Sequence, residues 1–283
     1  MTRSMHMLVA LALAIAAASI SLSSADQALS QRIGIVIMHG KGGSPKWHVE
    51  DLAFSLQGKG YLVANVEMPW SKMRSYDVNV SAAVKEVESA LDTLRSKGAQ
   101  KLFVAGHSLG GLFALHFGGR HSVDGIIAIA PGGDVSNSTF REKLGPAVDS
   151  ARRLVAEGKG NETARLNDYE NASGTYNIAA APSVYLSWFD PEGAMNQTSA
   201  VQGMNPSIPV LYIVPKGDYP GLQKVKDHFF SLLPKNPLSK LHEPYATHVR
   251  APSESGNEIV RWTTEVASRA NPALQVTPAG GRP

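Results

Sequence analysis

The 283-residue chain contains no cysteine and carries little net charge, and both shortages exclude classes of function. Without cysteine, the chain has no disulfide, no thiolate metal ligand and no cysteine nucleophile. Its formal net charge at pH 7 is only +3, and no basic cluster is interleaved with aromatic residues. Because binding to nucleic acid depends on dense positive charge, we expect no nucleic-acid partner.

The sequence also lacks the motifs that hold common cofactors. It has no His-x-x-x-His pair with an acidic partner and no carboxylate ladder, so we expect no metal site. No G-x-G-x-x-G follows a predicted strand, which excludes the dinucleotide fingerprint. The glycines at residues 40–43 are not followed by the Gly-Lys-Ser/Thr ending of a phosphate loop. The predicted chemistry therefore needs no cofactor.

Long apolar runs are absent except at the N-terminus. Arg3 precedes the apolar run 7–20, and small residues at Ser23 and Ala25 suit a cleavage site. This pattern predicts a secretory signal peptide that is cut after Ala25. Because the run is shorter than the roughly 20 residues that span a bilayer, an uncleaved anchor is the less favoured interpretation. We expect a secreted or periplasmic protein with no stable membrane span once residues 1–25 are removed.

Predicted strands and helices alternate through much of the remaining chain. Short β-branched apolar runs predict strands, and the segments between them carry apolar residues at helical spacing. This alternation predicts an α/β fold with a doubly wound, mostly parallel sheet of about six strands and helices on both faces. The predicted strands cover residues 33–38, 61–66, 101–105, 125–130, 209–214 and 239–243.

The alternation breaks between residues 136 and 207, after the fourth core strand. Residues 140–158 are predicted to form a polar helix, and residues 161–175 a loop. We expect an insert here that either covers the site as a lid or elaborates the surface. Residues 26–270 are then a single domain, and the Pro- and Gly-bearing residues 271–283 are expected to be a disordered tail.

The most informative motif is Gly106-His107-Ser108-Leu109-Gly110, a G-x-S-x-G pattern between a predicted strand and a predicted helix. In this context the serine occupies a sharp turn that exposes its hydroxyl. The two glycines remove Cβ atoms that would collide where the strand and helix pack closely. The start of the helix offers free N–H groups to a developing oxyanion. Ser108 is therefore the predicted nucleophile.

Over residues 33–270 the sequence resembles the α/β-hydrolase fold family. The family places the nucleophile first, then an acid, then a histidine, and Ser108, Asp218 and His248 keep this order. Each of the three also follows a predicted strand, so the carboxyl edge of the sheet can bring them together. The resemblance implies that Asp218 orients His248 and that His248 takes the proton from Ser108.

Alternatives stay open for the base and the acid. His242, within the last predicted strand, is the serious rival as base, whereas His107 is expected to point away from the serine. Asp134, after the fourth strand, is the alternative acid, and Asp190 is a third candidate. Pro215 stands where the family more often has glycine, which leaves the shape of the turn before the predicted acid open.

An oxyanion hole needs two backbone donors that are in place before the reaction begins. The N–H of Leu109, directly after the nucleophile, is the first candidate. The turn that begins at His39 reads His-Gly-Lys-Gly and resembles the family's His-Gly-x-Gly turn. The N–H of Lys41 is the predicted second donor, and that of Gly42 is the runner-up.

Aromatic residues after the second strand are candidates for contact with the substrate. Trp70 and Tyr76 are predicted to be substrate-binding, with core packing as the alternative interpretation. Trp188 and Phe189 are similar candidates from the insert. The sequence as a whole predicts hydrolysis of a small-molecule or lipid-like ester through an acyl-enzyme.

The same three residues would also serve other functions. An acyltransferase, a thioesterase or a peptidase uses the same chemistry on a different acceptor or bond, and a non-catalytic binding protein can share the fold. The pattern predicts no particular oligomeric state.

Overall fold

The computed structural model describes residues 32–170 and 173–269. The predicted signal peptide with its cleavage site, and the predicted tail from residue 271, lie outside the described residues. Within the described ranges, no helix combines the length and the apolar character that crossing a membrane requires.

The centre of the protein is a six-stranded sheet in which every pair of neighbouring strands is parallel. The strand order is β2-β1-β3-β4-β7-β8, so the chain winds outward from β1 in both directions. The prediction of a doubly wound sheet of about six strands is confirmed. The strands are β1 (Ile33–Met38), β2 (Leu62–Val66), β3 (Lys101–His107), β4 (Gly125–Ile129), β7 (Val210–Ile213) and β8 (Lys240–His242).

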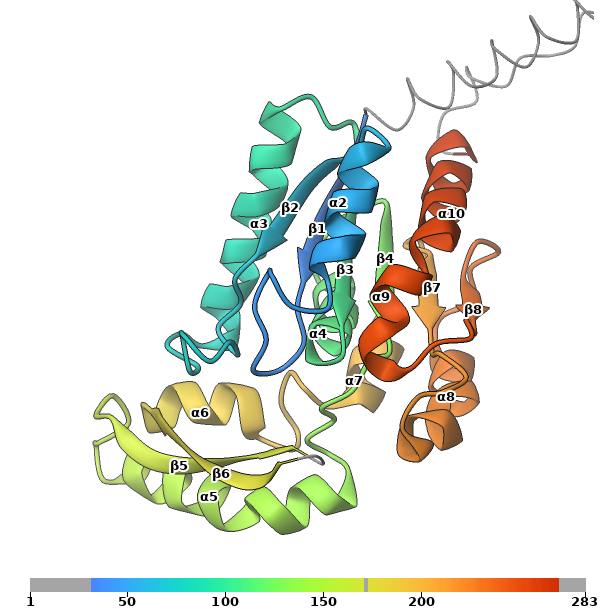
Figure 1. Cartoon of the computed structure of the whole chain (residues 1–283). Helices are drawn as coiled ribbons and strands as arrows, with labels where there is room; N and C mark the ends of the chain where they lie inside the picture. The colour runs from blue at the N-terminus through green and yellow to red at the C-terminus, as the bar shows by residue number, and fades with distance from the viewer. Residues whose placement is uncertain (1–31, 171–172, 270–283) are drawn as a thin grey trace, which may run out of the picture.

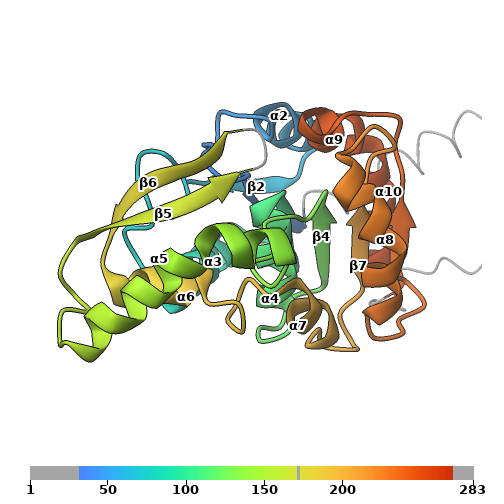
Figure 2. The same ribbon diagram turned by 90° about the horizontal axis from the view of Figure 1, so that it is seen from below.

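Helices lie on both sides of this sheet. Seen from below, α2 and α9 lie on one side, and α4 and α7 lie on the other (Figure 2). The helices are α2 (Glu50–Gly58), α3 (Val80–Ser96), α4 (Leu109–Gly118), α5 (Ser138–Ala156), α6 (Pro182–Phe189), α7 (Gln197–Gln202), α8 (Pro220–Leu232), α9 (Ala251–Glu254) and α10 (Gly256–Arg269), with the 3-10 helix η1 (His248–Arg250).

Successive side chains of the central strands enter two separate apolar cores. In β1, Ile35 and Ile37 pack in the core that includes residues of α2 and α10. Val36 and Met38 pack in the core that includes residues of α3 and α4. Because both faces are buried, β1 reads as one continuous apolar run rather than as an alternating one. Each fully buried aliphatic side chain stabilises the fold by about 1.5–3 kcal/mol.

The insert between β4 and β7 lies below the carboxyl ends of the strands (Figure 1). It holds α5, α6, α7 and an antiparallel pair, β5 (Ala164–Glu170) and β6 (Gly174–Ala180). The prediction of a loop over residues 161–175 is wrong, because most of this segment lies in the two strands. Only Leu166 and Asp168 of β5 are buried, so its sequence lacks the apolar alternation that reveals a strand.

The insert is packed firmly against the rest of the domain. Leu144 of α5 and Trp188 of α6 belong to the same apolar core as Val104 of β3. The indole N–H of Trp188 also donates a hydrogen bond to the carbonyl oxygen of Val78, at 2.8 Å. The insert therefore covers the carboxyl edge of the sheet and is packed against it in this structure.

Candidate active site

Ser108 lies in the sharp turn between β3 and α4. Its backbone φ of 55° and ψ of −117° lie in a region that residues with a Cβ rarely adopt, and such strain concentrates at functional sites. A Cβ added at Gly106 would overlap the carbonyl of Gly110, and one added at Gly110 would lie 2.7 Å from the carbonyl oxygen of His39. Only glycine fits at these two positions, so the motif encodes the turn that presents the serine.

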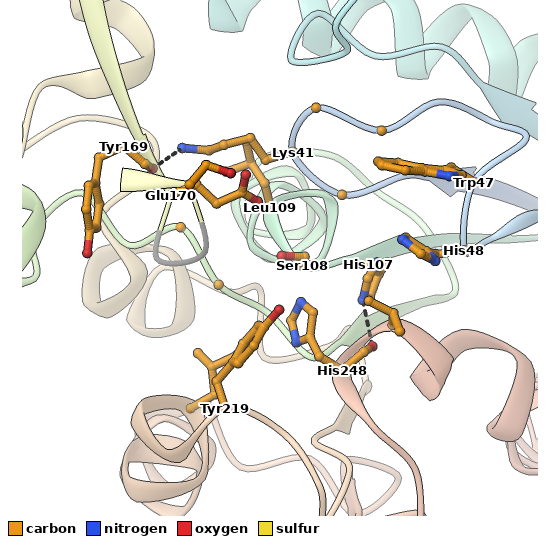
Figure 3. A pocket seen from close by; sticks show the side chains of 18 of the residues that line it. Lys41, Trp47, His48, His107, Ser108, Leu109, Tyr169, Glu170, Tyr219 and His248 are labelled. Atoms are coloured by element: carbon orange, nitrogen blue, oxygen red, sulfur yellow. Dashed lines mark hydrogen bonds between the residues drawn. The ribbon is translucent and has the colours of Figure 1, made fainter. Parts of the chain in front are cut away.

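The turn presents Ser108 to a cavity of about 320 Å³ at the carboxyl edge of the sheet. The walls come from the turn after β1, the segment before α2, the insert, and the loops after β7 and β8. Figure 3 shows residues from all of these segments around the serine. The labelled lining residues include Lys41, Trp47, His48, Tyr169, Tyr219 and His248.

His248 and Asp218 form a hydrogen-bonded pair at the edge of this cavity. Nδ1 of His248 lies 2.7 Å from Oδ1 of Asp218, and the two side chains are 11% and 0% exposed. The ring of His248 is directed toward the hydroxyl of Ser108 (Figure 3). With its Nδ1–H donated to the carboxylate, the imidazole keeps Nε2 free to accept a proton. This arrangement can run a serine–histidine–aspartate proton transfer.

The loops after β7 and β8 bring this pair together by continuing the parallel pairing of the two strands. The N–H of Gly217 donates to the carbonyl oxygen of Ala246 at 3.0 Å, and a Cβ at Gly217 would lie only 2.8 Å from that oxygen. The N–H of Asp218 donates to the carbonyl oxygen of Pro215 at 2.9 Å and closes the turn. Proline at position 215 is therefore compatible with the turn that directs Asp218 toward His248.

The structure places the alternative acids and the rival base elsewhere. Asp134 accepts hydrogen bonds from the backbone N–H groups of Ser136 and Gln197, at 3.0 and 3.1 Å, and so fixes the entrance to the insert. Asp190 is paired with Arg152 on the insert. His242 lies within β8 and is not among the residues that line the cavity.

Backbone N–H groups for an oxyanion are available on two sides of Ser108. The N–H of Leu109 is the first of α4, and Leu109 and Lys41 both line the cavity. The N–H of Gly42, the runner-up, is already donated to the carbonyl oxygen of Trp70 at 2.9 Å. The structure therefore favours Lys41 over Gly42 as the second donor.

Hydrogen bonds from the core hold the turn that contains Lys41. His39 donates from Nδ1 to the carbonyl oxygen of Gly40 at 2.8 Å and accepts at Nε2 from the N–H of Met68 at 3.0 Å. The indole N–H of Trp70 donates to the carbonyl oxygen of His39 at 2.9 Å. Trp70 is only 1% exposed and does not line the cavity. The prediction that Trp70 contacts the substrate is therefore corrected: Trp70 supports the turn from inside the core.

Tyr76 does not line the cavity of about 320 Å³ and is a core residue, although it lines a cavity of about 10 Å³ together with Lys41 and Leu109. It is 4% exposed, and its hydroxyl donates to Oδ2 of Asp168 at 3.0 Å. Trp188 and Phe189 likewise pack in the core beside it, with ring centroids 5.9 and 4.9 Å from that of Tyr76. These aromatic side chains are thus buried between the insert and the rest of the domain. The sequence pattern did not indicate this burial.

Comparisons with known proteins agree with this fold. The family model described as "Serine aminopeptidase, S33" matches residues 30–168. Esterase EstD of Thermotoga maritima is 25% identical over 108 residues, which are 34% of this chain and 26% of that protein. The match therefore spans about a quarter of the length of this curated relative.

Solved structures extend the likeness to most of the chain. The alpha/beta hydrolase GrgF from Penicillium sp. sh18 superposes with a TM-score of 0.64 at 15% identity, over 85% of this chain and 91% of that one. The Paleococcus ferrophilus monoacylglycerol lipase superposes with a TM-score of 0.56 at 20% identity, over 82% and 94%. This chain has the α/β-hydrolase fold.

Two histidines to which the sequence motifs gave no role in the reaction, His48 and His107, also line the cavity. The ring of His107 lies 4.8 Å from that of His248, and its Nε2–H donates to the carbonyl oxygen of His248 at 3.0 Å. His107 was expected to point away from the serine, and its contact joins positions 141 residues apart, which no local pattern can indicate. His48 stacks on Trp47 and lies T-shaped to His107.

Buried histidines are expected to make this protein less stable in acid. Burial lowers the pKa of His107 to about 3 and that of His116 to about 4, and it also lowers the pKa of His39. Between these values and the ordinary value of 6.5, the unfolded chain binds protons that the native state does not bind. The free energy of unfolding should therefore decrease as the pH is lowered from about 6.5 to 4, by about 1.4 kcal/mol per pH unit for each histidine.

Urea unfolding at pH 7 and at pH 5 measures this effect. The variant His116→Leu should show a shallower dependence on pH, by about one proton. His228→Gln, on the exposed surface of α8, is the matched control and should keep the wild-type slope. An unchanged slope in His116→Leu would contradict the assignment.

The described residues contain no group of three or more histidine and acidic side chains placed to hold a metal ion.

Proposed function

We propose that this α/β hydrolase cleaves carboxylic esters through an acyl-enzyme, with Ser108 as nucleophile, His248 as base and Asp218 as the acid that orients it. The observation that carries the proposal is the hydrogen bond between His248 and Asp218 beside a serine in a strained turn. The names of the relatives, an esterase and a monoacylglycerol lipase, support the same class of reaction.

In the first half of the proposed reaction, Oγ of Ser108 attacks the ester carbonyl carbon while Nε2 of His248 takes the hydroxyl proton. The N–H groups of Lys41 and Leu109 donate to the oxyanion that forms, in a cavity that is partly shielded from water. The tetrahedral intermediate then collapses. The bond to the alcohol breaks, His248 returns the proton to that alcohol, and Ser108 keeps the acyl group.

In the second half, a water molecule replaces the alcohol. His248 takes a proton from the water as it attacks the acyl-enzyme, and the same two N–H groups stabilise the second oxyanion. The bond between the acyl carbon and Oγ then breaks, His248 returns the proton to Oγ of Ser108, and the carboxylic acid leaves. Asp218 stabilises the imidazolium in both halves, and its buried hydrogen bond to Nδ1 keeps the ring in the productive orientation.

The size and lining of the cavity favour a small-molecule or lipid-like ester. A cavity of about 320 Å³ is at the lower end of ordinary ligand pockets. Trp47, Tyr169 and Tyr219 offer aromatic surface, and His48 and Lys72 add polar groups. Export, predicted from residues 1–25, is part of this proposal and would place the substrate outside the cytoplasm.

A peptidase is the second candidate, because the matching family model is described as a serine aminopeptidase. Glu170 lines the cavity and could bind a substrate ammonium group by charge. An aryl amide, whose amine leaves less readily than an alcohol, separates the two candidates.

Covalent labelling with a fluorophosphonate tests the proposal directly. We expect one label per chain, located by peptide mass spectrometry at Ser108, because the reagent forms a bond only with an activated nucleophile. A hydrolysis screen with aryl esters of graded acyl length and with aryl amides should show turnover of esters. Absence of label at Ser108 would refute the proposal, and turnover of amides above esters would favour the peptidase.

A further inference from the structure

We infer that Asp168, in the insert, is a positioning residue for the oxyanion hole. The carboxylate of Asp168 binds the side chain of Lys41, and this contact fixes the direction of the backbone N–H of Lys41. The inference rests on the proposed function, since it gives that N–H its part in the reaction. Neither the family resemblance nor the elbow motif points to the insert as a source of such a residue.

The contact between Lys41 and Asp168 is a buried ion pair. Nζ of Lys41 lies 2.6 Å from Oδ1 of Asp168, and the side chains are 8% and 0% exposed. Nζ also donates to the carbonyl oxygen of Tyr169 at 3.1 Å, drawn as a dashed line in Figure 3. The rings of Phe140 and Phe189 lie 5.3 and 5.7 Å from the ammonium. Shielding from water makes such a charged hydrogen bond stronger and more directional.

The carboxylate of Asp168 is itself held from several directions. Oδ2 accepts hydrogen bonds from the hydroxyls of Tyr76 at 3.0 Å and Tyr176 at 2.9 Å. Oδ1 also accepts from the backbone N–H of Tyr169 at 2.6 Å. Burial, together with the negative charge of Asp168, raises the pKa of both Tyr76 and Tyr176, so both hydroxyls stay protonated as donors. Asp168 is therefore a fixed point rather than a mobile surface carboxylate.

The core holds part of the turn that this ion pair reaches, because the carbonyl oxygen of Gly40 accepts from Nδ1 of His39 at 2.8 Å and from the N–H of Gly43 at 3.1 Å. Lys41 stands between Gly40 and Gly42, and Gly42 has a φ of +65°. On one side, the N–H of Gly42 is anchored to the carbonyl oxygen of Trp70 in the core. On the other side, the Lys41 side chain is anchored to Asp168 in the insert. Together with the hydrogen bonds of the Gly40 carbonyl, these two anchors on adjacent residues fix the direction of the Lys41 N–H. Displacement of such a group by about 1 Å can cost about 100-fold in rate.

The test compares Asp168→Asn, Lys41→Met and the double variant in hydrolysis of one aryl ester. All three keep the backbone N–H of residue 41. We expect each to lower kcat by about 10- to 100-fold and to leave KM within about twofold, because the oxyanion forms only in the transition state. Inhibition by an aryl boronic acid, whose serine adduct carries the same oxyanion, should weaken in parallel. The double variant should be no slower than the slower single variant, because the pair acts as one unit.

Glu192→Gln is the matched control, since it removes an insert carboxylate whose partner is Arg141 on the surface. It should keep wild-type kcat, KM and boronic acid inhibition. A role of Asp168 in stability alone would lower the melting temperature and leave kcat of the folded protein unchanged, which would overturn the inference. Losses that multiply in the double variant would overturn it as well.

The design also separates this inference from the proposed function. If the wild-type protein is unlabelled at Ser108 and inactive toward esters, the proposed function fails. If the wild type is labelled and active but Lys41→Met and the double variant keep full kcat, only the role of Asp168 fails. Should Asp168→Asn not fold because Lys41 is left as an unpaired buried charge, the uncharged double variant carries the test.

Discussion

Replacement of Ser108 by alanine is expected to lower kcat for ester hydrolysis by about 10⁴- to 10⁶-fold and to leave the fold intact. In the proposed reaction the oxygen of this hydroxyl bonds to the acyl group, and we expect no other group in the cavity to replace it. Within the described residues its removal breaks no hydrogen bond of the side chain. Alanine and serine both carry a Cβ, so the strain at φ 55° is the same in both proteins. Steady-state kinetics and thermal unfolding measure the two effects.

Ser75→Ala is the matched control for this variant. Ser75 also has a positive φ, at 47°, but it is not among the residues that line the cavity. It should retain wild-type turnover and wild-type labelling by the fluorophosphonate. Turnover in Ser108→Ala equal to that of Ser75→Ala, with both proteins folded, would show that another group is the nucleophile.

The sequence was most informative where structure is determined locally. The run at residues 33–38 predicted β1 because its β-branched side chains are buried on both faces of the sheet. The elbow could be predicted because Gly106 and Gly110 are required by close backbone contacts within and beside the motif. The parallel sheet places the segments after β7 and β8 at the same edge as Ser108. This placement and the chain order implied by the family resemblance pointed to Asp218 and His248, with Asp134 and His242 left as alternatives.

The sequence was least informative where distant segments meet. Asp168 contacts Lys41 although the two lie 127 positions apart in the sequence. Asp168 reaches Lys41 from β5, which pairs with β6 in the insert. The residues of β5 were predicted to form a loop because most of them are polar. Trp47 lines the cavity from the segment before α2, which begins at Glu50, and no motif in the sequence marks it for this contact.

Asp218→Asn is expected to lower kcat by about 10³- to 10⁴-fold, whereas Asp134→Asn should stay within a few-fold of the wild type. Oδ1 of Asp218 accepts from Nδ1 of His248 at 2.7 Å and from the N–H of Tyr219 at 2.7 Å. An asparagine that keeps its carbonyl oxygen in this place preserves the tautomer of His248 but loses the negative charge that stabilises the imidazolium. Steady-state kinetics of both variants, corrected for the folded fraction, measures the difference.

The alternative orientation of the asparagine would be no better. Its amide group would then face Nδ1 and favour the tautomer that carries the proton on Nε2, which cannot accept a proton from Ser108. In the first orientation, the NH₂ group would instead occupy the place of Oδ2, which is buried and has no hydrogen-bond partner within the described residues. That placement leaves a buried donor unsatisfied, at a cost of about 1–3 kcal/mol. A larger loss of kcat in Asp134→Asn than in Asp218→Asn would instead make Asp134, which here holds the entrance to the insert, the acid of the reaction.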